Sequence, residues 1–133
     1  MRSLVVDGAQ LVDAEVRKKS GISGAAVRAG YKTMVKIKPG IVEEAMGILL
    51  PGFAPAIDPF WEKARASGEP HRYFEEHATE IADALLGVTD RRAERAKHPV
   101  MKKLYRGLRG TALAQTASSV PSLSHLILRY DPL

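Results

Sequence analysis

Apolar residues recur at helical spacing along almost the whole chain. Side chains three and four positions apart share one face of a helix, whereas strands alternate with a period of two. No segment shows clean period-two alternation between turn residues, so the pattern predicts an all-α fold. We expect a compact single domain over residues 1–133, built from about six to eight short helices. The clearest apolar stripe lies within residues 70–86 and comprises Phe74, Ala78, Ile81, Ala82 and Leu85.

Glycine and proline positions set the expected helix ends. Gly21 suits a left-handed terminator of the first helix, Ser23 suits a cap of the second, and Gly87 suits a terminator of the helix over 70–86. The prolines at 51 and 55 each remove a helical hydrogen bond, so residues 51–57 are expected to form an irregular turn. The expected helices cover about 5–19, 23–37, 41–50, 59–67, 70–86, 89–98, 99 onwards, and a last one from 121.

Inner faces are also predicted on other helices. Gly107 and Gly110 interrupt the helix that begins at Pro99, and close helix packing or a kink would explain them. The predicted faces are Val5, Ala9, Val12 and Val16; Val27, Gly30, Tyr31, Met34 and Ile37; and Val100, Met101, Leu104, Tyr105, Leu108 and Ala112.

Composition narrows the class of protein. At 45% hydrophobic and 26% charged residues, the 133-residue chain has the balance of a soluble globular protein. It has no cysteine, which excludes disulfides, thiolate nucleophiles and cysteine-based metal sites. The N-terminus lacks the apolar stretch of a signal peptide, and apolar runs are far too short to span a membrane. We therefore expect a cytoplasmic protein with no membrane partner.

Charge is sorted by segment, although the net charge is only +5. Residues 1–42 carry 8 Lys and Arg against 3 Asp and Glu, residues 43–90 carry 3 against 10, and residues 91–133 carry 9 against 2. Such blocks concern partners and association rather than fold.

The basic blocks contain two predicted ridges. Arg28, Lys32 and Lys36 recur every four residues, with no acid between Glu15 and Glu43 to neutralise them. Like charges at this spacing destabilise a helix slightly, which favours an anionic partner. The second ridge comprises Lys102, Lys103, Arg106 and Arg109, and Arg91, Arg92, Arg95 and Lys97 precede it.

An acidic ridge of Glu76, Glu80 and Asp83 could complement these cations. The pairing could form within one molecule or between molecules. We therefore expect a non-enzymatic protein-interaction or self-associating module with complementary basic and acidic helical faces. The alternative is that the basic ridges bind nucleic acid or another polyanion.

Several stretches resemble a family of small helical proteins of unknown function, seen mainly in actinobacteria. The resemblance rests on the sequences at 19–27, 30–32, 38–42, 58–61 and 82–90. It implies one complete domain and carries no activity.

Other kinds of site have weaker support. Gly21-Ile22-Ser23 followed by Val27 fits part of a helix-turn-helix, but Arg17 and Gly30 fit it badly. His77 and Glu80 share a helical face without a matching pair on a second helix, so we expect no metal and no cofactor. We find no catalytic motif in the sequence and expect no catalytic residues. Phe60 and Trp61 are expected in the core, although they could line a small apolar pocket.

Overall fold

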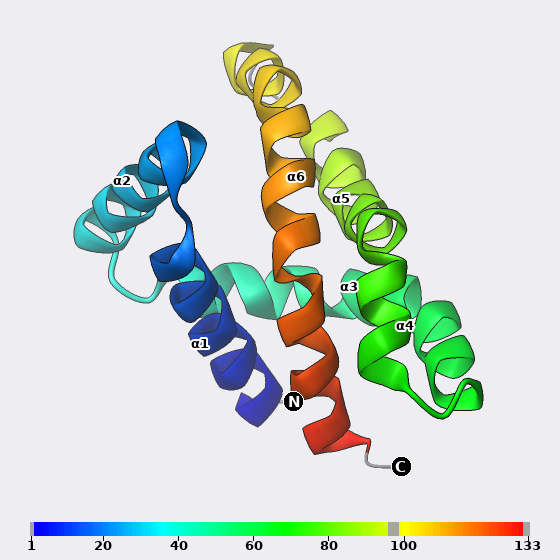
Figure 1. The fold of residues 1–133 in the computed structure, drawn as a ribbon. Helices are drawn as coiled ribbons and strands as arrows, with labels where there is room; N and C mark the ends of the chain where they lie inside the picture. The colour runs from blue at the N-terminus through cyan, green and yellow to red at the C-terminus, as the bar shows by residue number, and fades with distance from the viewer. Residues whose placement is uncertain (1, 96–98, 132–133) are drawn as a thin grey trace. The chain divides into compact units, whose positions relative to one another are not determined.

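A computed structural model describes residues 2–95 and 99–131, without the side chains of residues 2, 3, 23, 100, 101, 104 and 108. Every element in this part of the chain is a helix, so the predicted all-α class is confirmed (Figure 1). The number of helices fits the prediction, but two of them are long rather than short. Predictions for Lys97 and for the side chains of Val100, Met101, Leu104 and Leu108 lie outside the described residues. The predicted cap at Ser23 is wrong, because the second helix begins at Gly21 and Ser20 is its N-cap residue. The helices are α1 (Arg2–Lys18), α2 (Gly21–Ile37), α3 (Ile41–Ala66), α4 (Pro70–Glu76), α5 (Ala78–Glu94) and α6 (Pro99–Tyr130).

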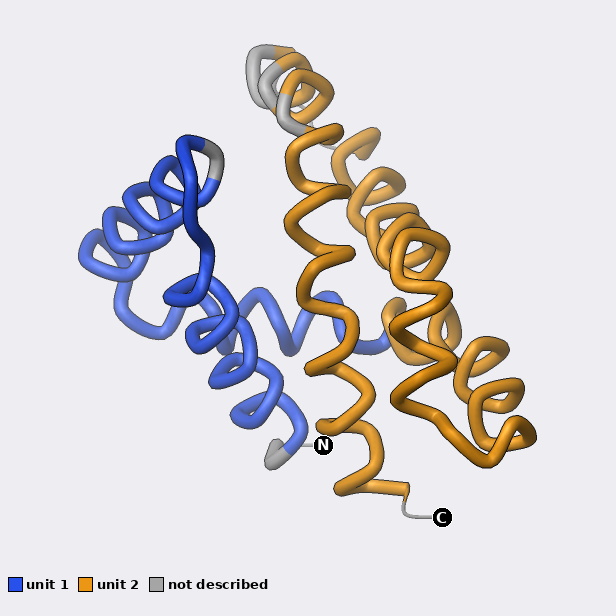
Figure 2. The backbone as a smooth tube through the Cα atoms, in the orientation of Figure 1, with its two compact units in different colours: residues 1–51 blue, residues 52–133 orange. Residues whose placement is uncertain are grey.

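The chain divides into two compact units, residues 1–51 and residues 52–133 (Figure 2). The boundary falls inside α3. Unit 1 contains α1, α2 and the beginning of α3, and unit 2 contains the rest of α3 with α4, α5 and α6. The predicted single domain stays a prediction.

In unit 1, α1 packs against α2. The predicted inner stripe of α1 is confirmed, because Ala9 is buried and Val5, Val12 and Val16 are half-buried. Gly8 lies against the Met46 side chain of α3, so a Cβ added there would come within 3.2 Å of the sulfur.

Unit 2 contains the main hydrophobic core, where α6 packs along α5 and α4. The stripe predicted from Phe74 to Leu85 is confirmed as the face turned to this core. The indole of Trp61 meets the ring of Phe74 edge to face, with centroids 5.6 Å apart. The buried core residues are Ile57, Trp61, Ala64, Phe74, Ile81, Ala82 and Val120.

The irregular turn predicted over 51–57 is wrong, because α3 continues through it. Pro51, Pro55 and Pro59 are all exposed, whereas Ile57 and Trp61 on the same helix are buried. Each proline removes one backbone hydrogen bond, and at a spacing of four the losses fall on one solvated side of the helix. The hydrogen bonds on the buried side persist, and burial of that side holds the helix together.

Other expected helix ends also lie elsewhere. Gly87 is inside α5, which runs on through Thr89 to Glu94, and Pro121 is inside α6. The break falls instead at His77, where φ is −114° and ψ is 22° and the backbone leaves the helical path between α4 and α5. Gly21 does adopt the predicted left-handed conformation, at φ 74°, but it begins α2.

Candidate binding surfaces

Helix α2 is held to α1 through one side only. Burial, and then the Asp13 carboxylate of α1, raise the pKa of Tyr31. Gly24 lies so close to the end of α1 that an added Cβ would come within 2.7 Å of the Lys19 carbonyl carbon. These contacts orient the side of α2 that carries Gly24 and Tyr31 toward α1.

The predicted inner face of α2 is therefore largely wrong. Val27 and Tyr31 are half-buried, but Gly30 is exposed, as are Met34 at 53% and Ile37 at 78%. Ile22 at the start of the helix is 93% exposed. The helix has more apolar positions than its contact with α1 covers.

The predicted ridge of α2 stands at this surface. Lys32 and Lys36 are exposed and Arg28 is half-buried. None of the three makes an ion pair with any residue that the structure describes. Neighbouring cations are paired: Arg17 with Asp13 at 2.9 Å, Lys18 with Glu15 at 2.8 Å, and Lys38 with Glu44 at 3.1 Å.

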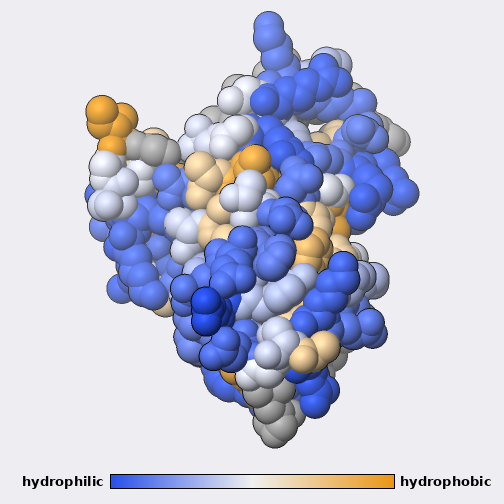
Figure 3. All heavy atoms as spheres, turned by 45° about the vertical axis from the view of Figure 1, so that its right-hand side comes forward, coloured by the Kyte–Doolittle hydropathy of each residue, from blue (hydrophilic) through white to orange (hydrophobic). Residues whose placement is uncertain are grey.

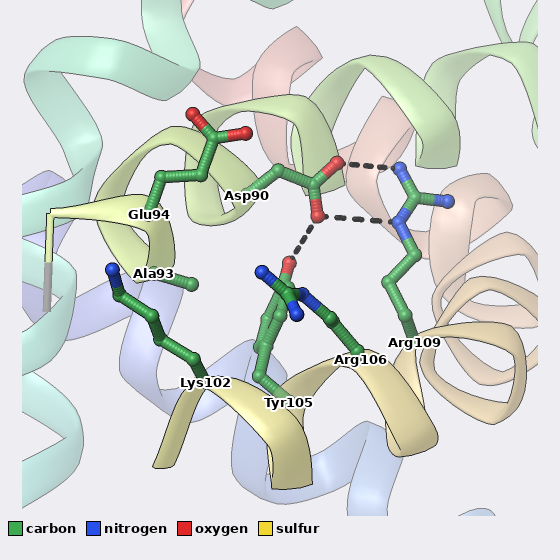
Figure 4. Close-up of a pocket in the computed structure, with 7 residues that line it drawn as sticks. All are labelled: Asp90, Ala93, Glu94, Lys102, Tyr105, Arg106 and Arg109. Atoms are coloured by element: carbon green, nitrogen blue, oxygen red, sulfur yellow. Dashed lines mark hydrogen bonds and ion pairs between the residues drawn. The ribbon is translucent and has the colours of Figure 1, made fainter. Parts of the chain in front are cut away.

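The ridge on α6 is divided between two roles. Arg109 turns toward α5, where its Nε and Nη2 donate to the two oxygens of Asp90 at 3.2 and 2.8 Å (Figure 4). Its Nη2 also donates to Asp83 at 3.1 Å, and the Tyr105 hydroxyl donates to Asp90. The hydrogen bonds from Arg109 and then Tyr105 lower the pKa of Asp90. Arg109 therefore joins two helices and is not free for a partner.

The other members of this ridge, Lys102, Lys103 and Arg106, have no ion pair in the described part of the chain. Lys102 and Arg106 line an open pocket of about 340 Å³ between α5 and α6 (Figure 4). Exposed cations also follow Asp90 near the end of α5. We call six of these side chains the basic tip: Arg91, Arg92, Arg95, Lys102, Lys103 and Arg106.

The acidic ridge is partly used inside the molecule. Glu76, on α4, pairs with Arg72 at 3.0 Å, and Asp83 pairs with Arg109 at 3.1 Å. Glu80 is exposed and has no ion pair among the described residues. The helix break at His77 also divides the ridge between α4 and α5. Much of its charge is thus satisfied without a second molecule.

A hydrogen-bonded array of Ser124, His71 and Glu75 escaped the sequence analysis. The Ser124 hydroxyl lies 2.8 Å from His71 Nδ1, and His71 Nε2 lies against the Glu75 carboxylate. The order resembles a nucleophile–base–acid triad, but Ser124 is 0% exposed and donates to the Pro121 carbonyl. A substrate cannot reach this hydroxyl, so the array links α4 to α6 as a structural contact. Residues 53 positions apart give no sequence signal for it.

Phe60 and Trp61 lie at the hydrophobic core, as expected. Trp61 is 7% exposed, and Phe60 packs against the core. The Trp61 indole N–H donates to Asp131 at 2.7 Å. Around His77 and Glu80, as elsewhere in residues 2–95 and 99–131, no group of three or more His, Asp or Glu side chains is placed to hold a metal ion.

No single helix of the described chain has both the length and the apolar character to cross a membrane. One pair of segments meets the criteria together, namely Gly24–Ile37 and Ile41–Ala66, with a bend of 104° at the break between them. On the face shown in Figure 3, hydrophilic residues predominate and hydrophobic residues form separate patches.

Residues 1–131 match a family of unknown function, DUF6918. The chain belongs to this family. The match agrees with the resemblance found in the sequence and carries no activity with it. No curated protein matches the chain, and no solved structure does.

Proposed function

We propose that this protein is a non-enzymatic binding module that recognises anionic surfaces through its unpaired cations. The observation that carries the proposal is the contrast in pairing. The α2 ridge and the basic tip have no ion pairs in the described chain, whereas two of the three acidic-ridge residues are paired internally. Unpaired cations on one helix repel each other, and an anionic partner removes that cost.

A polyanion titration tests this proposal. Fluorescence anisotropy with a labelled DNA duplex, over a salt series, should give a log affinity that falls linearly with log salt. The variants R28Q/K32Q/K36Q and K102Q/K103Q/R106Q remove three unpaired cations each. We expect each to reduce the salt slope, by roughly 0.9 for every phosphate that the variant no longer neutralises.

The matched control is R17Q/K38Q/R72Q, which lowers net charge equally but removes paired cations. It should change affinity less than either test variant. Equal losses in all three variants would mean that net charge alone drives binding. That result, or no binding to polyanions or anionic vesicles at low salt, contradicts the proposal.

Association with a protein or with a second copy is the second candidate. It is favoured by the exposed apolar side chains of α2, since large exposed apolar residues in a group often mark an interface. Sedimentation velocity of the protein over a concentration series tests self-association. We infer a cytoplasmic location for either function, and we expect relatives mainly in actinobacteria.

A further inference from the structure

Helix α2 presents two distinct strips at its exposed surface. With about 100° of rotation per residue, Arg28, Lys32 and Lys36 fall within an arc of about 80°. A second arc of about 120° contains no charged residue. We call this arc the apolar strip, after its members Ile22, Ala26, Gly30, Met34 and Ile37. Ser23 and Thr33 also fall within the arc, and the Thr33 hydroxyl donates a hydrogen bond to the Ala29 carbonyl of the same helix at 2.9 Å. The apolar strip meets the cationic strip, formed by Arg28, Lys32 and Lys36, across Ala29.

Both strips are open to an external partner. Ala26, Ala29 and Gly30 are exposed, together with the three large apolar side chains described above. An added Cβ on Gly30 would meet no atom within 4 Å. Gly24, on the opposite side of α2, lies against the end of α1, so the packing of α1 against α2 leaves both strips facing outward.

The basic tip differs from α2 in this respect. Among its described side chains and those beside it, none is a large exposed hydrophobic residue. A tip of this kind suits phosphate contacts alone. The α2 surface adds apolar side chains to cations, a combination that nucleic-acid backbones do not require.

An anionic lipid surface matches both strips at once. Interfacial helices bury an apolar face at the boundary of headgroups and acyl chains, while lysine and arginine on the adjoining face contact anionic headgroups. Lysine side chains reach the headgroups with their ammonium ends while their methylene stems stay among apolar groups. Helix α2 contains no acid that would repel such a surface.

Length and composition favour a helix that lies on the membrane. The 17 residues of α2 extend roughly 25 Å, less than a span of about 30 Å requires, and the cationic strip runs along them. The sequence prediction of no membrane partner considered only spanning segments. Gly24–Ile37 of α2 and Ile41–Ala66 of α3 are together long and apolar enough to meet the criteria for a membrane span, but the chain bends between them. This apolar character is consistent with contact at the membrane–water interface.

We infer that α2 docks on an anionic lipid bilayer, with Ile22, Met34 and Ile37 inserted and Arg28, Lys32 and Lys36 at the headgroups. This inference rests on the proposed recognition of anionic surfaces and names the surface that α2 recognises.

Co-sedimentation with vesicles tests the inference. The full chain should sediment with vesicles of phosphatidylcholine and phosphatidylglycerol, and not with phosphatidylcholine alone. R28Q/K32Q/K36Q should weaken binding about a hundredfold at low salt, because each cation near an anionic surface contributes to the attraction. I22S/I37S should weaken binding about tenfold or more, because two apolar side chains that would insert into the bilayer are lost.

Matched controls separate the strip from general surface character. V6S/Y130S changes two exposed apolar residues on α1 and α6 and should bind vesicles as the wild type does. Circular dichroism should show unchanged helicity in all variants, since the substituted positions are exposed or half-buried. A Met34→Trp variant adds a reporter, whose emission should shift to the blue on anionic vesicles while the buried Trp61 signal stays constant.

Four results would overturn the inference. I22S/I37S binding as tightly as V6S/Y130S would show that the apolar strip does not insert. Binding of the DNA duplex without binding of vesicles would leave the proposed function standing and remove the lipid surface, whereas binding of neither would remove both. Self-association that I22S/I37S abolishes, without vesicle binding, would assign the strip to a second copy.

Discussion

The two units of this protein use their apolar residues differently. Every member of the main core cluster lies in unit 2, from Ile57 to Val120. In unit 1, the large apolar side chains Val6, Ile22, Met34, Ile37 and Ile48 are exposed. Unit 2 therefore buries its apolar side chains against its own helices, and unit 1 leaves several at the surface.

The difference shows that a helical apolar stripe alone does not identify a core. The stripe from Phe74 to Leu85 and the one from Val27 to Ile37 have the same periodicity. Only the first is covered along its length, because α6 lies along α4 and α5. The second is exposed at Gly30, Met34 and Ile37, and the membrane docking that we propose uses it.

The largest expected effect is a cavity in unit 2. Phe74→Ala should lower the free energy of unfolding by about 3–5 kcal/mol, because it removes a fully buried ring against Trp61. Urea unfolding followed by circular dichroism measures it.

A milder pair of substitutions, isoleucine to valine at one position in each unit, compares the two units with the same chemical change. Ile81→Val, in the core, should cost about 0.5–1.5 kcal/mol. Ile37→Val, on the exposed strip, should stay within about 0.5 kcal/mol of the wild type. Equal costs would contradict the contrast between the units.

The second prediction concerns Asp131, just after α6. Its carboxylate accepts hydrogen bonds from the Trp61 indole at 2.7 Å and from Arg65 Nη1 at 2.9 and 3.0 Å. Asp131→Ala leaves the largely buried indole N–H without this partner and should cost about 1–3 kcal/mol, measured by urea unfolding. Arg65→Ala removes only the exposed ion pair and should cost less than about 1 kcal/mol. Equal losses would mean that the indole hydrogen bond contributes little.

The third prediction uses glycines in different surroundings. A Cβ on Gly52 would lie 2.7 Å from Val88 Cγ1, so Gly52→Ala should destabilise the protein by about 1 kcal/mol. Gly107 has no atom within 4 Å of such a Cβ, which corrects the expected close packing at this glycine. Gly107→Ala should therefore stabilise the protein by up to about 1 kcal/mol, through helix propensity. Thermal melts of the two variants should shift in opposite directions.

The smallest expected effect is the pH dependence from Asp90. Folding lowers the pKa of Asp90 from its ordinary value of 3.8, because the ionised carboxylate accepts hydrogen bonds from Arg109 and Tyr105. These bonds therefore stabilise the folded protein fully at pH values above 3.8. As the pH falls below about 4 and then through the lowered pKa of the folded state, Asp90 becomes protonated and this stabilisation is lost. Asp90→Asn should lower the free energy of unfolding by no more than about 1 kcal/mol at neutral pH. The acid limb, meaning the fall of unfolding free energy with decreasing pH in urea unfolding at acidic pH, should be less steep in this variant.

Asp58→Asn is the control for this prediction. Asp58 is exposed and has no ion pair in the described chain. Its substitution should leave the acid limb unchanged. The same slope in Asp90→Asn and the wild type would show that the Asp90 contacts add no pH-dependent stability.

Part of the candidate site was accessible from sequence. The unpaired state of the α2 ridge follows from the absence of acids between Glu15 and Glu43, which local spacing reveals. The pairing of Arg109 with Asp83 and Asp90 did not follow, because their proximity depends on how α5 and α6 pack. The Ser124–His71 contact likewise joins residues whose separation in sequence hides it.

The sequence by itself determined the helical class, the inner stripes of α1 and α5, and the segregation of charge, since these depend on local spacing and composition. Tertiary structure decided which prolines and glycines end a helix. At Pro51, Pro55 and Pro59 the missing hydrogen bonds lie on a solvated side, and burial of the other side keeps α3 continuous. Tertiary structure also decided which apolar stripe is buried, because burial requires a second helix along that face.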